Sequence, residues 1–266
     1  MNGKKSIFIT GAASGIGLET ARLFAQNNWF VGISDKNEDG LKSLETEVGI
    51  EKCFSMLMDV TDSTEVHKAI EAFTHRTRGR LDVLFNNAGI LKFGPFDKVS
   101  LEDNLRIVDV NVKGVINCVH CALDFLKKTP GARIITMASV SAVYGIPDLS
   151  VYSATKSAVC ALTEALDIEL ERYGIIVSDI LAPYVNTPML TYTDNVAYSV
   201  KRMGVKIQPF EVARLVWKAA HGRKLHWKMG RSTRLLSGLF WIMPFIKRFV
   251  VKTLTANPNS KSGQCP

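Results

Sequence analysis

Residues 6–17, SIFITGAASGIG, join a short apolar run to a glycine-rich turn. Ile7, Phe8 and Ile9 have side chains typical of a buried strand. Beyond the turn, Ala21 and the pair Phe24 and Ala25 recur at one-turn spacing, as on a helix. The stretch therefore predicts a strand that passes through a tight turn directly into a helix.

Three glycines shape this turn. Gly11, Gly15 and Gly17 allow a tight backbone path and let N–H groups approach a pyrophosphate at the positive end of the helix. Their spacing, G-x-x-x-G-x-G, differs from the general G-x-G-x-x-G fingerprint, and any tight turn could use glycine. Because the turn follows the first strand of a βαβ unit, we expect a dinucleotide site to which Ser14 and Ile16 contribute.

Short apolar runs alternate with amphipathic stretches along the rest of the chain. The runs predict strands at 6–10, 30–34, 53–58, 81–85, 133–138, 175–181 and 225–229. Helical patterns lie between them. This alternation predicts an α/β fold, a doubly wound Rossmann-type sheet of seven mostly parallel strands with helices on both faces.

The totals are those of a globular chain of 266 residues, 47% hydrophobic and 22% charged. No linker divides it, so we expect one domain over residues 1–254 and a disordered tail over 255–266. No signal peptide is evident at the N-terminus.

The five cysteines suggest a reducing environment. They are odd in number and lack the spacing of a disulfide framework, which favours free thiols and a cytoplasmic protein. Cys118 and Cys121 form a CVHC motif, but it lies on a helical pattern at 108–126 and has no second pair. We therefore expect helix packing there and no metal site.

An acidic residue ends the second strand. Asp35 can accept hydrogen bonds from a ribose 2′-hydroxyl and would repel a 2′-phosphate. Lys36 beside it could compensate for that phosphate, and Asp35 could also be a loop-capping carboxylate. We favour NAD over NADP.

Polar residues also follow the third and fourth strands, where open α/β sheets bind ligands. Asp59 and Val60 come after the third strand, and Asp59 could receive an adenine amino group. Asn87, Ala88 and Gly89, in the NNAG motif, could form the floor of an adenosine pocket, although turn chemistry alone would explain them.

Tyr152 and Lys156 lie four residues apart in VYSATKSAV, so they share one helix face among small side chains. Taken alone, the pair is equally typical of a half-buried tyrosine beside a solvated lysine.

Together, five motifs resemble those of the short-chain dehydrogenase/reductase family over about residues 5–230. They are TGAASGIG, NNAG, Asn111 in VNVKG, Ser139 in MASVSA and YSATK, in this order. The resemblance implies that Tyr152 is a general acid/base and that Lys156 activates it and holds the nicotinamide ribose. An adjacent ammonium is expected to lower the pKa of the phenol.

The resemblance also implies roles for residues around this pair. Ser139 would bind the substrate oxygen, with Ser141 as a competitor for that role, and Asn111 would anchor a water in a proton relay. Val185 and Thr187 would hold the carboxamide of the cofactor. Tyr184 stands where the family usually has glycine, and it could wall the substrate pocket.

Substrate choice in such folds usually falls to the segment after the sixth strand, here 188–212. It mixes aromatic and polar residues without a charged pair suited to a small acid, so we read it as a lid over an apolar pocket. We expect a secondary alcohol or ketone on a sterol, retinoid or fatty-chain skeleton. A sensor or scaffold that binds dinucleotide without turnover is the alternative.

The C-terminal part of the chain is strongly basic. Residues 201–252 hold 13 Lys and Arg against one acid, Glu211, within a chain of net charge +8. Residues 231–254 combine an apolar centre that includes Trp241 and Phe245 with basic flanks. Peripheral contact with an anionic membrane, a homo-oligomer contact and a flap over the pocket all remain open. Nucleic-acid binding is disfavoured because the cations are interleaved with aliphatic residues.

Overall fold

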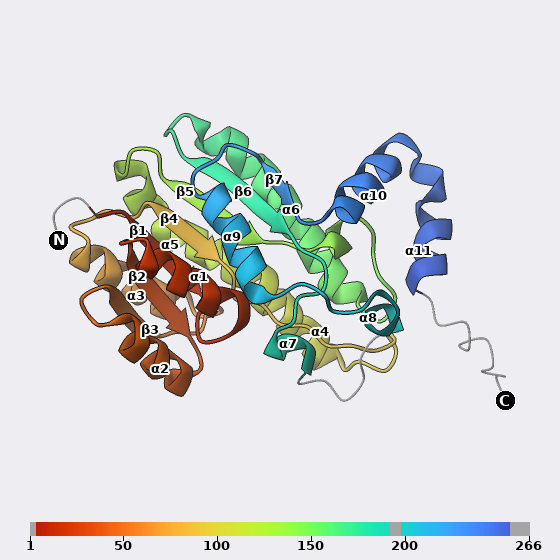
Figure 1. The fold of residues 1–266 in the computed structure, drawn as a ribbon, viewed down its shortest axis with the longest axis horizontal. Coiled ribbons are helices and arrows are strands. Elements are labelled where there is room, and N and C mark those ends of the chain that lie inside the picture. Colours follow the sequence, from red (N-terminus) through yellow and green to blue (C-terminus); the bar gives the residue numbers. More distant parts are fainter. Residues whose placement is uncertain (1–3, 192–197, 256–266) are drawn as a thin grey trace.

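The computed structural model of the protein describes residues 4–191 and 198–255. Its centre is a seven-stranded sheet with the order β3-β2-β1-β4-β5-β6-β7 (Figure 1). The strands are β1 (Ser6–Thr10), β2 (Phe30–Asp35), β3 (Cys53–Leu57), β4 (Val83–Asn86), β5 (Arg133–Met137), β6 (Ile176–Leu181) and β7 (His226–Lys228).

The sheet confirms the predicted fold class. Each predicted strand is present with its ends within two residues of the prediction, and all the strand pairings are parallel. The strand order reverses direction between β1 and β4. In a doubly wound sheet, ligands bind at the carboxyl ends of the strands beside this switch point. The single domain predicted over residues 1–254 remains a prediction.

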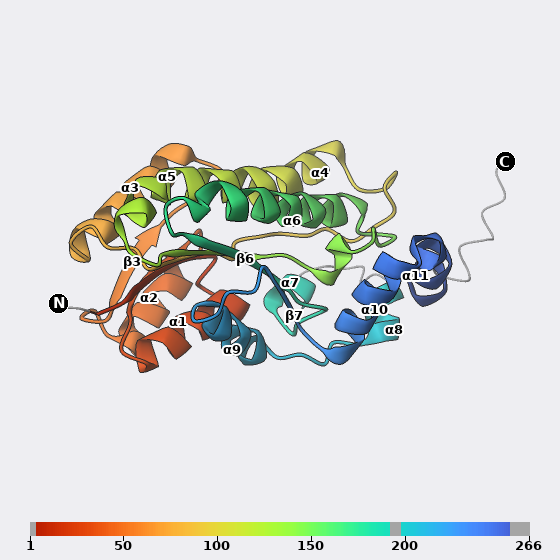
Figure 2. The same ribbon diagram turned by 90° about the horizontal axis from the view of Figure 1, so that it is seen from above.

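Helices cover both faces of the sheet (Figure 2). One face carries α1 (Gly15–Gln26), α2 (Glu38–Val48) and α9 (Pro209–Ala219). The other carries α3 (Ser63–Arg76), α4 (Leu101–Val108), α5 (Gly114–Lys128) and α6 (Ser150–Glu171). Because both faces are covered, β1 is buried over its whole length, as its apolar sequence predicts.

One long helical pattern is interrupted in the structure. The sequence predicted continuous helix over 108–126, but a π-helical turn, Asp109–Lys113, joins α4 to α5. Such turns insert one extra residue into a helix and occur frequently at functional sites. This one contains Asn111.

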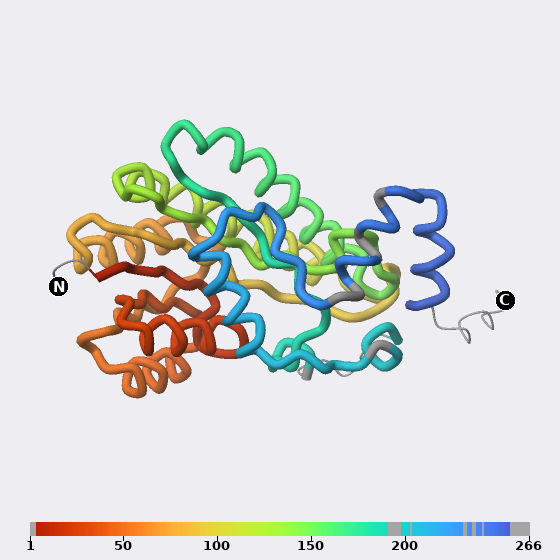
Figure 3. The backbone as a smooth tube through the Cα atoms, turned by 45° about the horizontal axis from the view of Figure 1, so that its top comes forward, coloured from red at the N-terminus to blue at the C-terminus, as the bar shows by residue number. Residues whose placement is uncertain are grey.

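The last part of the chain lies beyond one end of the sheet, away from the N-terminus (Figures 1 and 3). After β6 come α7 (Pro188–Thr191) and α8 (Tyr198–Met203), and after β7 come α10 (Arg231–Ile242), a 3₁₀ turn (Pro244–Ile246) and α11 (Lys247–Thr255). The prediction that 255 begins a disordered tail was wrong at its first residue, because Thr255 is buried at the end of α11. Residues 256–266 of that predicted tail and 192–197 of the predicted lid lie outside the described residues.

Candidate active site

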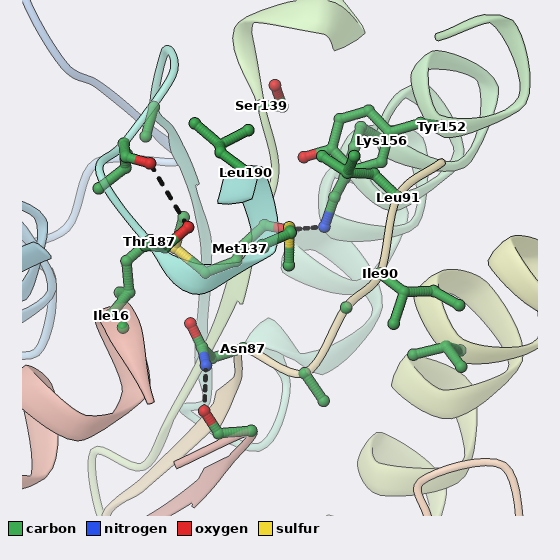
Figure 4. A pocket seen from close by; sticks show the side chains of 18 of the residues that line it. Ile16, Asn87, Ile90, Leu91, Met137, Ser139, Tyr152, Lys156, Thr187 and Leu190 are labelled. Carbon is green, nitrogen blue, oxygen red and sulfur yellow. Dashed lines mark hydrogen bonds between the residues drawn. The ribbon is translucent and has the colours of Figure 1, made fainter. Parts of the chain in front are cut away.

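A cavity of about 630 Å³ lies along the carboxyl ends of strands β1 to β6 (Figure 4). Of the residues predicted for the site, Gly17 and Asn111 do not line it. The others do, and they are Gly11, Ser14, Gly15, Ile16, Asp35, Asp59, Val60, Asn87, Ala88, Gly89, Ser139, Tyr152, Lys156, Val185 and Thr187. The topology therefore brings residues that are up to 176 positions apart into one cavity.

The glycine turn is tight enough to require glycine. Gly11 and Gly15 have φ angles of 65° and 54°, in the left-handed region that side chains disfavour. A Cβ atom on Gly15 would lie 3.0 Å from Thr187 Cγ2, and one on Gly17 would collide with the carbonyl oxygen of Gly11. The backbone at the start of α1 is thus kept open towards the cavity.

Ser14 occupies the N-cap position of α1, but its side chain makes no capping hydrogen bond. An N-cap serine usually accepts a hydrogen bond from the backbone one turn into the helix. Its hydroxyl therefore remains available to an anion at this positive helix end, where phosphate binds readily.

Asn87 holds the glycine turn against β4. Its amide nitrogen donates to the carbonyl oxygens of Thr10 and Gly11, at 3.0 and 2.9 Å. The backbone N–H groups of Asn87 and Ala88 in turn donate to the hydroxyl of Thr10. NNAG is therefore more than a local turn, because it fixes the glycine turn in place.

Asp35 is anchored beside that turn. One carboxylate oxygen accepts a hydrogen bond from the N–H of Ala13 and the other from the N–H of Asn37, both at 3.0 Å. Each carboxylate oxygen can accept further hydrogen bonds from a ligand. The negative charge is thus fixed at the end of β2.

The Asp59 carboxylate is paired with two cationic side chains, an arrangement that the sequence did not predict. The carboxylate forms ion pairs with Lys36 at 2.8 Å and Arg106 at 3.2 Å. Partial burial raises the pKa of Asp59, but hydrogen bonds from Lys36, Thr61 and Arg106 outweigh it and hold that pKa well below its usual range. Arg106 had no signal in the sequence, because α4 brings it to the cavity from another part of the chain.

Asn111 is completely buried, and its side chain is fully used by the protein. The amide oxygen accepts from the N–H of Ile90 at 2.8 Å, and the amide nitrogen donates to the Ile90 carbonyl and the Thr155 hydroxyl. The side chain thus ties the loop after β4 to α6, the helix that carries Tyr152 and Lys156. Its proposed water-anchoring role remains a prediction.

Ser139, Tyr152 and Lys156 lie around the same part of the cavity (Figure 4). Tyr152 projects from α6 into the region where Ser139 also lies, and Ser139 is the N-cap of a 3₁₀ turn (Val140–Ala142) that follows β5. The ammonium of Lys156 donates to the carbonyl of Met137 at 2.7 Å and lies 5.6 Å from the centre of the Tyr152 ring.

The expected lowering of the tyrosine pKa was wrong for this arrangement. Burial raises the pKa of Tyr152 to about 12, although its interaction with the Ser139 hydroxyl works in the opposite direction. Burial also lowers the pKa of Lys156 to about 8. Loss of solvation disfavours the charged form of each group.

Ser141 also lines the cavity, so which of the two serines binds the substrate oxygen remains a prediction. Ser141 is buried, and its hydroxyl has no hydrogen-bond partner, whereas its backbone N–H donates to the Ser139 hydroxyl at 3.2 Å. The backbone thus orients the Ser139 side chain towards the cavity end that holds Tyr152.

The cavity end beside Tyr152 is apolar. Loop residues that the sequence did not single out line it, including Leu91, Ile146 and Leu149. Tyr184 also lines it, and its hydroxyl shares a hydrogen bond of 2.7 Å with Ser199 on α8. This tyrosine therefore links the cavity wall to a helix within the segment 188–212 that was predicted as a lid.

The CVHC motif lies on α5, with its first two residues buried, His120 exposed and Cys121 partly buried. Cys118 is buried on α5, and Cys121 contacts the carbonyl of Ser63. Within residues 4–191 and 198–255, no group of three or more His, Cys, Asp or Glu side chains is placed to hold a metal ion.

Comparisons with known proteins agree with this geometry. The family model described as short chain dehydrogenase matches residues 5–196. Oxidoreductase UcpA from Salmonella typhimurium is 34% identical over 224 residues, covering 83% of this chain and 82% of that protein.

Two solved structures share the fold and carry bound cofactors. The 3-ketoacyl-(acyl-carrier-protein) reductase from Brucella melitensis, complexed with NADH, has a TM-score of 0.76 and 30% identity and covers 85% of this chain and 96% of that chain. The alcohol dehydrogenase from Thermococcus sibiricus, complexed with 5-hydroxy-NADP, has a TM-score of 0.75 and 25% identity, with the same coverage of 85% and 96%.

Proposed function

This chain belongs to the short-chain dehydrogenase/reductase family, and we propose that it interconverts a secondary alcohol and a ketone on a hydrophobic substrate. NAD(P)-dependent oxidoreduction is the activity at the level of the family. The observation that carries the finer proposal is the convergence of Ser139, Tyr152 and Lys156 at an apolar cavity end.

The cavity fits a dinucleotide. The glycine turn and the Ser14 hydroxyl, which makes no capping hydrogen bond, are suited to binding a pyrophosphate. The Asp35 carboxylate is suited to accepting hydrogen bonds from the hydroxyls of a ribose. When bound, the nicotinamide supplies the acceptor or donor of the hydride. Val185 and Thr187 would hold the end of the cofactor nearest the substrate.

We favour NAD over NADP because of the charges at the end of β2. The anchored Asp35 carboxylate would repel a 2′-phosphate. Lys36, the residue that could offset this repulsion, is paired with Asp59 on the neighbouring strand end. One solved relative is complexed with NADH and another with an NADP analogue, so membership of the family does not decide between the two cofactors. The preference for NAD is therefore argued from the residues of this chain alone.

The protein groups divide the remaining chemistry between them. Tyr152, with a pKa of about 12, is protonated at neutral pH and can donate that proton to a developing alkoxide, as ketone reduction requires. The Ser139 hydroxyl stabilises charge on the same oxygen. Lys156 holds the ribose and adds positive charge beside the phenol.

The substrate class follows from the cavity wall. Leu91, Ile146, Leu149 and Tyr184 offer apolar surface and no paired cations for a carboxylate. We therefore propose a sterol, retinoid or fatty-chain alcohol or ketone. We also propose a cytoplasmic location, which the free thiols of the four described cysteines support.

Replacing Tyr152 with Phe tests the function. Tyr152→Phe removes only the transferable proton, so kcat should fall at least about 10²-fold while NAD affinity is retained. The assay is the absorbance of reduced cofactor with a panel of apolar secondary alcohols and ketones. Tyr144→Phe is the control, because Tyr144 lies in the segment just before α6 and does not line the cavity.

The outcome separates the enzyme from the alternative. A Tyr152→Phe variant that keeps more than about a tenth of wild-type kcat would reject the assignment of this residue. Wild-type protein that binds NAD and turns over no member of the panel would favour a dinucleotide sensor or scaffold.

A further inference from the structure

Helices α10 and α11 each bury some of their described side chains, among them Phe240 on α10. Val251 and Thr255 on α11 are buried, and the Arg202 guanidinium of α8 donates to the Thr253 carbonyl at 2.6 Å. Arg248, Val251 and Lys252 also face the loop that precedes α6. Since the Ser199 hydroxyl of α8 is hydrogen-bonded to Tyr184 of the cavity wall, α11 contacts the helix that is attached to that wall.

Other apolar side chains of this C-terminal segment are exposed. Leu235 and Ile242 on α10 are 73% and 71% exposed, and Phe245 and Phe249 beyond it are 76% and 73% exposed. Leu235 and Ile242 are seven residues apart, about two turns, and therefore share one face of α10. Phe245 lies in the 3₁₀ turn, and Phe249 lies on α11. We call these four residues the C-terminal apolar surface. The side chain of Trp241, which the sequence suggested as a further member, lies outside the described part of the chain.

Cations surround this surface. Arg234, Arg248 and Lys252 are exposed, and Lys247 is partly exposed. The chain contains no Asp or Glu after Glu211. Among the described residues, no carboxylate forms an ion pair with any of these four cations.

Exposed apolar side chains of this number usually mark an interaction site. A second copy of this chain would bring the same acid-free, basic segment to a symmetric interface, so like charges would oppose each other. An anionic lipid surface offers the complementary charge and accepts the aromatic side chains. No helix in the described ranges could span a bilayer, so contact would be confined to the interface.

We propose that the C-terminal apolar surface binds the interface of a bilayer that contains anionic lipid. The two outermost phenylalanines enter the boundary between headgroups and acyl chains, and the four cations bind the headgroups. If the proposed function holds, this orientation places α8 and the wall of the cavity that it contacts on the side of the molecule that binds the bilayer, in which an apolar substrate dissolves.

Vesicle sedimentation of the full-length protein tests this proposal. Wild-type protein should sediment with vesicles of equal parts phosphatidylglycerol and phosphatidylcholine, and remain in solution with phosphatidylcholine alone. In about 1 M salt, where the Debye length is about 3 Å, binding should fall sharply. Arg248→Gln together with Lys252→Gln should weaken binding about 30-fold.

The apolar contribution is tested separately. Phe245→Ser together with Phe249→Ser should weaken vesicle binding at least about tenfold. The matched control is Ile50→Ser together with Leu57→Ser, which removes two exposed apolar side chains at the opposite edge of the sheet. The control should bind as wild type does. Circular dichroism and NAD affinity should be unchanged in both double variants.

Two results would overturn the proposal. Sedimentation that is equal on neutral and anionic vesicles would remove the role of the cations. A wild-type protein that ignores vesicles, and that becomes a smaller species on gel filtration after the phenylalanine changes, would make this surface a contact between copies. Neither measurement needs turnover, so a protein that binds anionic vesicles without oxidising any alcohol would reject only the proposed function.

Discussion

Burial acts in opposite directions on the two titratable groups at the end of the cavity. It raises the pKa of Tyr152 to about 12 and lowers that of Lys156 to about 8. Both shifts favour the neutral form, so the site is poised as a proton donor with an ammonium that is easily lost above pH 8.

The two serines of the loop after β5 should differ strongly in their effect on catalysis. Ser139→Ala should lower kcat about 10²–10³-fold, because it removes a donor to the substrate oxygen. Ser141→Ala should change kcat less than about fivefold, since its buried hydroxyl forms no hydrogen bond that the change would remove. NAD affinity, measured by titration, should be retained in both variants. If Ser141→Ala lowered kcat more than Ser139→Ala does, Ser141 would be the residue that binds the substrate oxygen.

At the level of residues, the sequence located the site but not its electrostatics. Spacing alone placed Tyr152 and Lys156 on one helix face, and the structure has them there. The sequence could not show that burial would be the main cause of the pKa shifts of Tyr152 and Lys156, because their burial depends on loops from distant parts of the chain. For the same reason it missed Arg106 and the apolar residues Leu91 and Ile146. The catalytic roles of the predicted residues remain to be tested.

Among the elements, β2 and α3 pack closely around one glycine. A Cβ atom on Gly32 would lie 2.6 Å from Phe73 Cδ2 and 2.7 Å from Phe8 Cδ2, within a cluster of stacked and edge-on rings. Gly32→Ala should therefore lower the free energy of unfolding by about 1–3 kcal/mol through overpacking. Urea unfolding measures this change.

Gly145→Ala is the matched control for Gly32→Ala. It also adds one methyl group, but in open space and without a positive φ angle. It should change stability by less than about 0.5 kcal/mol. If both variants were equally stable, the rings around Gly32 would have to move apart without cost.

Strands β6 and β7 are joined by a buried ion pair. Asp179 is completely buried, and both its carboxylate oxygens lie 3.0 Å from His226 Nδ1. The hydrogen bond to Asp179 raises the pKa of His226 above its usual value, in spite of partial burial. Burial raises the pKa of Asp179, although His226 lowers it.

These directions make the pair most stabilising at low pH. A raised histidine pKa contributes stability that is complete below the unfolded pKa, near 6.5, and is lost as pH rises through the folded pKa. At pH 6, Asp179→Asn should lower the free energy of unfolding by about 1.5–3 kcal/mol. The difference from wild type should shrink towards pH 8.

Denaturant unfolding across pH 6–8 checks the effect of Asp179→Asn. Asp124→Asn serves as the control, because that carboxylate is 81% exposed and should change stability little at either pH. A difference for Asp179→Asn that stays constant or grows with pH would mean that His226 is not charged in the folded protein.

Strands β1 and β2 were predictable because each is a mostly apolar run that is buried over all or nearly all of its length. The π-helical turn around Asn111 was not, since one extra residue leaves the hydrophobic pattern of 108–126 almost unchanged. The basic and apolar composition of 231–254 was visible in the sequence. Which of its faces packs on α8 and which is exposed depends on tertiary contacts that composition does not encode.

Across the whole molecule, the candidate cofactor site draws on most of the sheet. The glycine turn after β1, Asp35 at the end of β2, Asp59 after β3, NNAG after β4 and Thr187 after β6 all line it. A ligand that contacts all these segments can bind only when they are assembled. Cofactor binding should therefore stabilise the entire fold by mass action.

Thermal unfolding with each cofactor tests this linkage and the preference for NAD together. At about 100 times its Kd, NAD should add about 2.7 kcal/mol to the free energy of unfolding, which corresponds to a rise in Tm of about 5–10 °C for a chain of this size. NADP at the same concentration should give a smaller rise, because Asp35 repels the 2′-phosphate.

Asp35→Ala should reduce the difference between the Tm shifts that NAD and NADP produce, because it removes both a hydrogen-bond acceptor for the ribose and a charge that repels the 2′-phosphate. The ratio of the two Tm shifts is the appropriate measure, since loss of the Asp35 contact to Ala13 weakens the glycine turn for both ligands. Asp39→Ala, which removes a nearby acid on α2 that does not line the cavity, should leave the ratio as in wild type. A wild-type protein stabilised more by NADP than by NAD would reverse the assignment. The ion pair of Lys36 with Asp59 would then have to open so that Lys36 could bind the phosphate.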